Sequence, residues 1–288
     1  MTTIDHTQAA VMDAAARELS DDRARAERAA GTRRFRRSIR NAGIRLVSLA
    51  VFLLLWEWAG ANIDPVLFTT PTAVAKAAVE MIGSGELWNY LWPSLKVLAI
   101  GFSLACAIGI GLGLLLARYE ILDVSLSVYI TFLYSIPSVA LVPLIVLWAG
   151  FDTTAKVIIL FMFAFFPMVI NTYQGVKAVD PKLVEVGRAF RCSERQLWGN
   201  IVLPAALPFI VTGLRLALGR GLIGMVLADL YTAISGIGYL IVRTASTYQV
   251  AKMFVPIVTL GLLGVTLTAL LRLAEKYVAP WTNASDED

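Results

Sequence analysis

Long apolar blocks separated by short polar stretches make up most of the chain. A helix of about twenty apolar residues spans the hydrocarbon core of a bilayer. A segment in lipid must satisfy its own backbone hydrogen bonds, so each block is expected to be helical. The pattern predicts an all-α polytopic membrane protein with six transmembrane helices, at about residues 44–62, 97–117, 124–151, 157–175, 206–231 and 253–272.

Local signals refine this picture. Thr70 and Pro71 open an amphipathic helix that ends at Gly83 and should lie along the outer membrane surface. In the third block, Pro137 and Pro143 should bend or interrupt the helix. The second block has small residues every fourth position, which permits close helix packing: Ala105, Gly109, Gly113 and Ala117.

Composition and charge indicate the class and the orientation. Of the 288 residues, 58% are hydrophobic, which excludes an ordinary water-soluble domain. Arginines precede the first block, and the positive-inside rule therefore places the N-terminus in the cytoplasm, within reach of membrane lipid head groups. Six spans return the C-terminus to the same side. The expected parts are a charged cytoplasmic tail (1–43), a first transmembrane helix with the outer amphipathic segment (44–96), a core (97–278) and a cytoplasmic C-terminal tail (279–288).

Several kinds of chemistry find no support in the sequence. The single histidine, His6, lies in the N-terminal tail, so no metal site is predicted. Cys106 and Cys192 are expected to be unpaired. The net charge of +4 does not argue for a nucleic-acid partner. No phosphate-binding G-x-x-x-x-G-K-[ST] motif occurs, so the chain is expected to hold no cofactor of its own and to draw energy through a partner.

The longest charged stretch between apolar blocks runs from Asp180 to Pro208. Asp180 followed by Pro181 is a helix start, because the Asp side chain accepts orphan N–H groups and Pro loses nothing at the first position. Ser193 and Gln196 have the capping-box spacing of a second helix, which runs toward Pro204. The stretch predicts a short helix, a tight turn and a second helix. Helix counting places it in the cytoplasm.

The fifth span carries charges that are unusual inside a membrane. At about 100° per residue, Arg215 and Asp229 lie within about 40° of each other, whereas Arg220 is about half a turn from Asp229. We expect Arg215 to reach the inner interface and Asp229 the outer one. Arg220 is then the better candidate to face a path for an anionic solute. Tyr134, Ser135 and Pro137, at an expected helix break, could also expose polar groups to such a path, although core packing is the simpler interpretation.

The spacing from Glu185 through position 191 to Ile201–Pro204 resembles the cytoplasmic "EAA" loop of permeases of binding-protein-dependent ABC importers. The similarity is greatest to the sulfonate, taurine and nitrate branch and covers most of residues 65–278. It extends to LFTTPTAV at 67–74, YSIPSVALVPLIVLWAG at 134–150, FFPMVINTYQGVKAVDP at 165–181, TGLRLALGRG at 212–221 and SGIGYLI at 235–241.

This resemblance implies a fold and a set of partners. The fold would be the type I ABC-importer transmembrane fold, with a coupling loop at 176–205. The loop would seat in a groove of a separate ATPase subunit, present in two copies, which binds ATP and magnesium. A second permease copy, which would make a homodimer, and an extracytoplasmic solute-binding protein would complete the importer in the bacterial inner membrane. The implied ATPase-coupling residues are Asp180, Glu185, Gly187, Arg188, Arg191, Leu203 and Pro204.

The chain departs from the family pattern at Val186, Gly187 and Arg191, where Ala, Ala and Gly are usual. If Arg191 keeps the left-handed turn, it should cost about 1 kcal/mol. Two other functions stay open at this point. An ion-coupled secondary transporter acting alone should show internal symmetry and mid-membrane acids. A membrane enzyme should show clustered nucleophiles, metal ligands or paired acids. The expected solute is small and anionic, like a sulfonate, taurine or nitrate.

Overall fold

The computed structural model describes residues 40–278. The two predicted tails lie largely or wholly outside this range, as do His6 and most of the arginines before the first block. The chain divides into two compact units, residues 1–62 and 63–288. The first unit contains one described helix, Arg40–Ala61, whose 22 residues are long and apolar enough to cross a membrane. This helix confirms the first predicted span.

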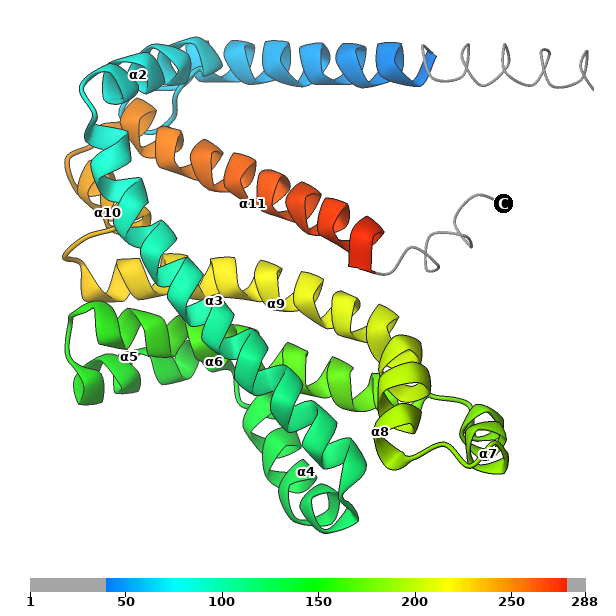
Figure 1. Ribbon diagram of the computed structural model, residues 1–288. Helices are drawn as coiled ribbons and strands as arrows, with labels where there is room; N and C mark the ends of the chain where they lie inside the picture. Colours follow the sequence, from blue (N-terminus) through cyan, green and yellow to red (C-terminus); the bar gives the residue numbers. More distant parts are fainter. Residues whose placement is uncertain (1–39, 279–288) are drawn as a thin grey trace, which may run out of the picture. The chain divides into compact units, whose positions relative to one another are not determined.

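The second unit is helical throughout its described part (Figure 1). Its elements, in chain order, are α2 (Pro71–Gly83), α3 (Glu86–Arg118), α4 (Glu120–Ser135), α5 (Ser138–Ala149), α6 (Thr153–Lys177), α7 (Pro181–Ala189), α8 (Glu194–Leu197), the π-helical turn η1 (Trp198–Val202), α9 (Leu203–Thr232), α10 (Ile237–Ser246) and α11 (Val250–Val278).

The predicted amphipathic helix is α2. Its N-cap is Thr70, whose hydroxyl accepts a hydrogen bond from the Ala73 N–H at 3.2 Å. Pro71 occupies the first turn, where its missing N–H costs nothing. Val74, Ala77 and Met81 form the buried stripe. The helix therefore begins and ends where the sequence predicts.

Within residues 40–278, five helices are long and apolar enough to span a membrane. The pair α4 and α5 makes a sixth span if it is counted as one, but the two helices are bent by 96°. Ile136 takes an extended conformation because it precedes Pro137, which ends α4. Pro143 lies inside α5 without ending it. The predicted interruption of the third block is confirmed at Pro137 only.

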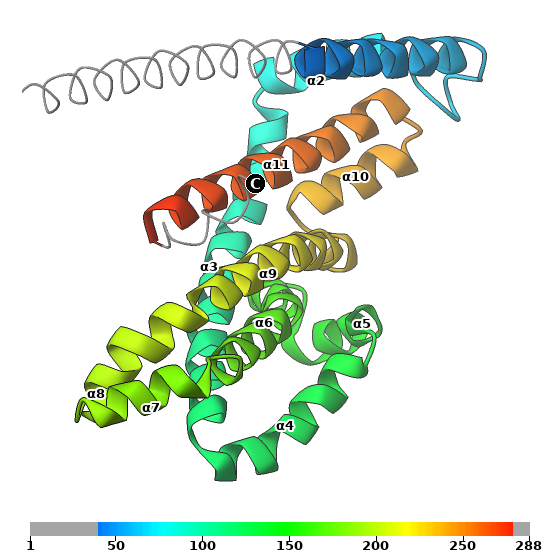
Figure 2. The same cartoon turned by 90° about the vertical axis from the view of Figure 1, so that its right-hand side faces the viewer.

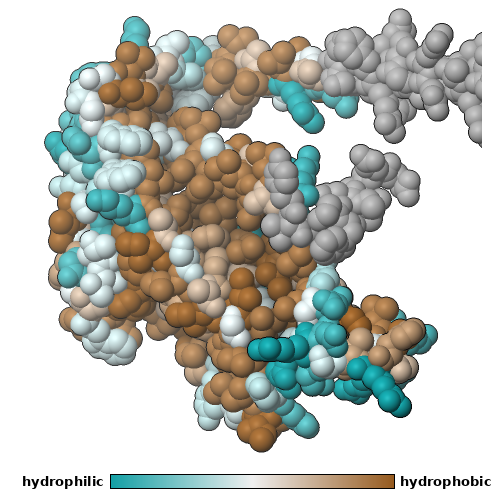
Figure 3. All heavy atoms as spheres, viewed as in Figure 1, coloured by the Kyte–Doolittle hydropathy of each residue, from teal (hydrophilic) through white to brown (hydrophobic). Residues whose placement is uncertain are grey.

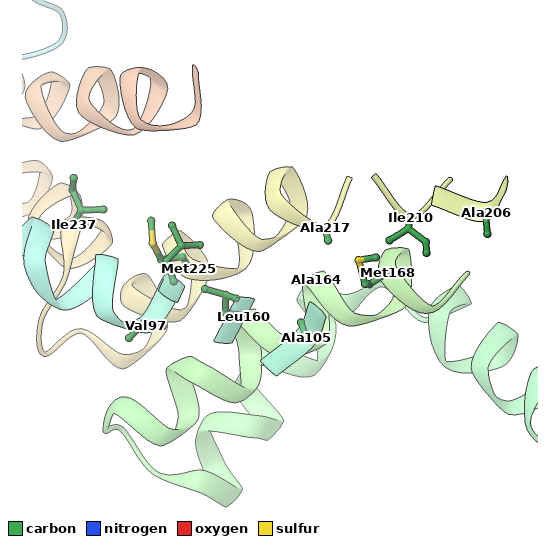
Figure 4. Close-up of a cluster of buried hydrophobic side chains, with 11 residues drawn as sticks. Val97, Ala105, Leu160, Ala164, Met168, Ala206, Ile210, Ala217, Met225 and Ile237 are labelled. Atoms are coloured by element: carbon green, nitrogen blue, oxygen red, sulfur yellow. The ribbon is translucent and has the colours of Figure 1, made fainter. Parts of the chain in front are cut away.

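Helices α3, α6 and α9 form the core. Figures 1 and 2 show α6 and α9 side by side with α3 crossing them. The buried side chains between them are mostly aliphatic (Figure 4). A Cβ on Gly109 would lie 2.8 Å from Met168 Cβ, and one on Gly113 would lie 2.7 Å from Thr172 Cβ. The predicted small-residue packing of the second span is thus the contact between α3 and α6.

Polar groups gather at the two ends of this bundle. Figure 3 shows a broad hydrophobic surface, with hydrophilic residues over α7 and α8 and along the edge formed by α10. The first end is joined by an ion pair between Lys177 of α6 and Asp123 of α4, 3.0 Å apart. At the other end, Lys252 of α11 pairs with Glu80 of α2 at 3.1 Å. The charges lie where spans begin and end, as expected for a membrane bundle.

Candidate functional site

The loop between α6 and α9 folds as two capped helices. Asp180 is the N-cap of α7, and its carboxylate accepts a hydrogen bond from the Lys182 N–H at 2.9 Å. Ser193 is the N-cap of α8, and Gln196 returns its side chain to the Ser193 N–H at 2.8 Å, completing a capping box. Both predicted helix starts are confirmed. They are local features, since each depends on side chains within three residues of the helix start.

The turn between the two helices is left-handed at Arg191, where φ is +55°. The Cys192 N–H donates to the Gly187 carbonyl at 3.0 Å, which closes the C-terminus of α7. Arg191 therefore occupies the position where glycine is free of strain. The left-handed backbone expected for this turn is kept, so Arg191 carries the strain that a glycine would avoid.

Gly187 has a different role, because it is the contact between the two helices. It is the buried residue of α7, and a Cβ there would lie 2.7 Å from the Ile201 side chain. Leu197, itself buried, is the next neighbour at 3.7 Å. A small residue at position 187 lets α7 pack directly on the helix that follows.

The second helix of the loop continues into the membrane. Glu194–Thr232 forms one helical run of 39 residues, so the separate loop helix and fifth span predicted from sequence are a single element. The Leu203 N–H donates to the Trp198 carbonyl, five residues back, and this makes the π-helical turn η1. Pro204 has no N–H for the Asn200 carbonyl, and the wider turn accommodates this loss. Leu203 and Pro204 thus join the loop to the span.

The loop presents a mixed surface. Leu183 and Val186 of α7 and its C-cap residue Phe190 lie on one face, with 49%, 52% and 80% of their area exposed. Glu185 and Arg188 are also exposed. Behind α7 lies a cavity of about 490 Å³, lined by both of these charged residues and by Trp198 among others.

Arg118, at the end of α3, connects the loop to the bundle. Its guanidinium lies 3.7 Å from the Glu194 carboxylate and 5.0 Å from the centroid of the Trp198 ring. The pair is largely exposed, so its contribution to stability is small. Its position still links the first turn of α8 to a neighbouring span.

The four residues suggested for a solute path come from two distant parts of the chain. Tyr134, Ser135 and Pro137 lie at the break between α4 and α5. Arg220 lies within α9, far away in sequence, and its Cζ atom is 5.0 Å from the centroid of the Tyr134 ring. The Ser135 hydroxyl donates to the Thr131 carbonyl of its own helix at 2.8 Å. The fold therefore brings Arg220 to the helix break.

The prediction for Asp229 is wrong. The side chain does not reach the membrane interface but is fully buried, 2.8 Å from Lys156 Nζ. Lys156 is buried as well, with 3% of its area exposed. The nearby Asp152 side chain caps α6 by accepting from the Thr154 N–H. Two opposite charges near the ends of neighbouring spans were the signal available in the sequence, because such charges are stable in a bundle when they pair.

Arg215 forms an ion pair, and the two cysteines are unpaired. Arg215 donates to Glu275 of α11 at 2.8 Å. Cys106 and Cys192 are free thiols, each partly buried. Among residues 40–278, no group of three or more His, Cys, Asp or Glu side chains is arranged to hold a metal ion.

Solved structures of known transporters share this fold. The inward-facing MetNI methionine ABC transporter has a chain that matches with a TM-score of 0.52 at 20% identity, over 66% of this chain and 92% of that chain. An amino acid ABC transporter with histidines matches with a TM-score of 0.53 at 18% identity, over 69% and 98%. The fold is the transmembrane fold of type I ABC importers, as predicted.

Sequence relatives define the family. The aliphatic sulfonates transport permease SsuC of Bacillus subtilis is 34% identical over 82% of this chain and 86% of its own length. The formylaminopyrimidine transport permease ThiX of Halalkalibacterium halodurans is 29% identical over 80% and 92%. Residues 109–283 match the family described as the binding-protein-dependent transport system inner membrane component. The chain belongs to this family.

This membership decides between the functions that the sequence left open. The relatives are permease proteins of ABC transport systems, so the chain is a transport subunit and not an enzyme. The alternative of a secondary transporter acting alone is set aside. The predicted resemblance to the sulfonate and taurine permeases is confirmed by relatives of both names.

Proposed function

We propose that this permease docks on a separate ABC ATPase through α7 and α8, and that closure of two ATPase subunits moves the attached spans. The observation that carries the proposal is the exposed apolar face of α7, Leu183, Val186 and Phe190, on a loop outside the apolar bundle. An exposed apolar face of this kind is typical of a protein interface. Glu185 and Arg188 lie on the other side of α7, where they line the cavity behind it. The coupling residues are Asp180, Glu185, Gly187, Arg188, Arg191, Leu203 and Pro204.

The geometry suits a lever. Asp180 and the capping box at Ser193 hold both short helices, and Gly187 packs one against the other. The second helix continues without a break into α9. A push on the loop is therefore transmitted directly to a span, as a rigid displacement rather than an unfolding.

The full assembly would contain two permease copies, two ATPase subunits and an extracytoplasmic solute-binding protein. The loop and both termini would lie in the cytoplasm, and the chain would be a multi-pass protein of the inner membrane. The support for this orientation is the arginine cluster before the first span. Lys177 and Arg118, which end two spans at the loop side, agree with it.

The solute would be small, and the path would pass Tyr134, Ser135, Pro137 and Arg220. The named solutes of the relatives include aliphatic sulfonates, taurine and formylaminopyrimidine. A guanidinium at the helix break favours an anion among these classes, because it supplies charge and several donors in one place.

Co-purification of the tagged permease with its ATPase tests the docking proposal. In mild detergent, Glu185→Arg should release the ATPase and abolish ATP-dependent uptake while the permease still inserts. Lys76→Glu is the matched control, since Lys76 is also exposed but lies on α2. Equal retention of the ATPase by both variants, with normal uptake, would remove the coupling role from Glu185.

A further inference from the structure

The corner between α3 and α4, residues 118–123, contacts the loop between α6 and α9 at two separate places. Helix α3 ends at Arg118, α4 begins at Glu120, and Tyr119 is the one residue between them. Tyr119 has an extended backbone, with φ −112° and ψ 110°, so neither helix continues through it. The corner therefore joins the ends of two spans on the side of the bundle where the loop lies (Figure 1).

The first contact is at the start of the loop. One carboxylate oxygen of Asp123, Oδ2, accepts hydrogen bonds from Lys177 Nζ and from the Tyr173 hydroxyl, both at 3.0 Å. The Lys177 ammonium also lies 5.5 Å from the centroid of the Tyr173 ring. Lys177 is the last residue of α6, and Asp180 caps α7 shortly after it. This cluster fastens the point where the loop leaves α6 to the first turn of α4.

The second contact is on the helix that ends the loop. The Arg118 guanidinium lies 3.7 Å from the carboxylate of Glu194, the first residue of α8. It is also within cation–π range of two rings, 5.0 Å from the Trp198 centroid and 5.6 Å from the Tyr119 centroid. Trp198 begins η1, which leads into α9. The corner is therefore in contact with both the start of the loop and its second helix.

Helix α4 is held mainly at its ends. None of its residues is buried within the described chain, and Ile121, Val124 and Val128 are 83%, 73% and 68% exposed. An open groove of about 300 Å³ lies between α4 and its neighbours α3 and α6. Figures 1 and 2 both place α4 at the edge of the bundle. Its far end is the break at Pro137, so the contacts of the corner largely set the direction of the helix.

The placement of the two contacts is more informative than their strength. The Lys177 side chain is 48% exposed and the Arg118 side chain 38%, and a partly exposed ion pair adds little to the stability of a fold. A loop that is fastened at one point can pivot about that point. A loop that is fastened both at its start and at its second helix carries the corner with it, or breaks both contacts.

We infer that Arg118 and Asp123 are positioning residues that transmit a displacement of the loop to α3 and α4. This route is additional to the direct continuation of the loop into α9. The inference rests on the proposed function, since docking on an ATPase is what would displace the loop. Contacts at helix ends can shift packed helices as rigid bodies, and here they would tilt α4 without unfolding it.

Distances between spin labels in the complete transporter test this inference. Cys106→Ala and Cys192→Ala remove the native thiols. Ile121→Cys or Lys182→Cys then places one label on the exposed surface of α4 or of α7 in each permease copy. Pulsed electron paramagnetic resonance measures the distance between the copies without nucleotide and after trapping with ATP and vanadate. With the corner intact, both distances should shift by a few ångströms on trapping.

The double variant Arg118→Gln with Asp123→Lys removes both contacts of the corner. The label on α7 should then shift as before, because the loop is still pushed. The label on α4 should keep its nucleotide-free distance and lose most of its shift. Either substitution alone should give an intermediate loss.

Charge exchange distinguishes the ion pair from a general effect of substitution. Asp123→Lys combined with Lys177→Asp re-forms the pair with its charges exchanged, so it should restore the shift of the α4 label that Asp123→Lys alone reduces. Lys252→Gln is the matched control, because it breaks an exposed pair with Glu80 at the other end of the bundle. It should change neither distance.

The outcomes separate this inference from the proposed function. A chain that retains no ATPase or no second copy, or an α7 label that does not shift on trapping, would contradict the proposed function. A shift of the α4 label that the double variant leaves unchanged would overturn the inference alone. A double variant whose nucleotide-free distance at α4 is already altered would show that the contacts only set a resting position, and it would also overturn the inference.

Discussion

Lys156 of α6 and Asp229 of α9 form an ion pair in the interior of the protein, 2.8 Å apart and with 3% and 0% of their side chains exposed. The Ser94 hydroxyl of α3 donates to the other carboxylate oxygen at 2.5 Å, and the Ile237 N–H donates to Ser94 at 2.8 Å. Lys156 also donates to the Ser235 hydroxyl at 3.1 Å. One network thus joins α3, α6 and α9 to the start of α10.

Removing one charge from this pair should destabilise the protein strongly. Asp229→Asn leaves the Lys156 ammonium buried without a counter-charge, and a broken buried pair costs about 3–5 kcal/mol. We expect a large fall in the thermal unfolding midpoint in detergent. Lys252→Gln is the control, since it breaks the exposed pair with Glu80 and should cost less than about 1 kcal/mol. Similar shifts for both variants would contradict the buried-pair interpretation.

Gly236→Ala should disturb the same network through sterics alone. Gly236 has φ +100°, which side chains rarely adopt, and an added Cβ would overlap the Asp229 carboxylate. We expect a lower unfolding midpoint and faster proteolysis between α9 and α10. Gly219→Ala, within α9, meets nothing within 4 Å and should be neutral or slightly stabilising. A Gly236→Ala protein as stable as Gly219→Ala would argue against the tight turn.

Gly113→Leu should separate α3 from α6. A Cβ at this position would lie 2.7 Å from Thr172 Cβ and 2.8 Å from the Val169 carbonyl, so a larger residue requires backbone movement. Overpacking of a core typically costs about 1–3 kcal/mol. Folded yield on size-exclusion chromatography is the measurement. Gly111→Leu faces open space and should behave as the wild type; if it fails equally, helix packing is not the cause.

Arg191→Gly should relieve the strained turn of the coupling loop. Arg191 has φ +55°, and glycine adopts this conformation with a gain of about 1 kcal/mol. Hydrogen exchange of the Cys192 N–H, which donates to Gly187, should slow about fivefold. Arg188→Gly, inside α7, should speed the same exchange, because glycine weakens a helix interior. Faster exchange in Arg191→Gly would contradict the strain.

Local chemistry made much of the fold predictable. The caps at Thr70, Asp180 and Ser193 lie at the expected helix starts, and the break at Pro137 divides the third span. These features depend on residues within one turn of each other. The length of the second loop helix was not predictable in this way. Pro204 suggested a stop, but a π-helical turn accommodates the proline and the helix continues.

The candidate site was predicted in part. The sequence spacing predicted the loop between α6 and α9. The assignment of its residues to ATPase coupling stays a prediction. For the path, the sequence indicated Tyr134, Ser135, Pro137 and Arg220 separately, and the fold places Arg220 against Tyr134. Asp229 was assigned to an interface because helical periodicity describes one helix at a time. Its partners Lys156 and Ser94 come from two other helices.

The sequence by itself determined the class of this protein: apolar blocks of membrane length, their capped ends and a charged loop with family spacing. These properties are local because the bilayer requires each span to satisfy its own backbone. Only the tertiary structure decided which charges are paired, buried or left open. Whether a charge is stable inside the bundle depends on the charged and polar groups that lie beside it. For Asp229 and Arg220 the neighbouring groups lie on other helices, which are brought into contact by the packing of glycines and aliphatic side chains.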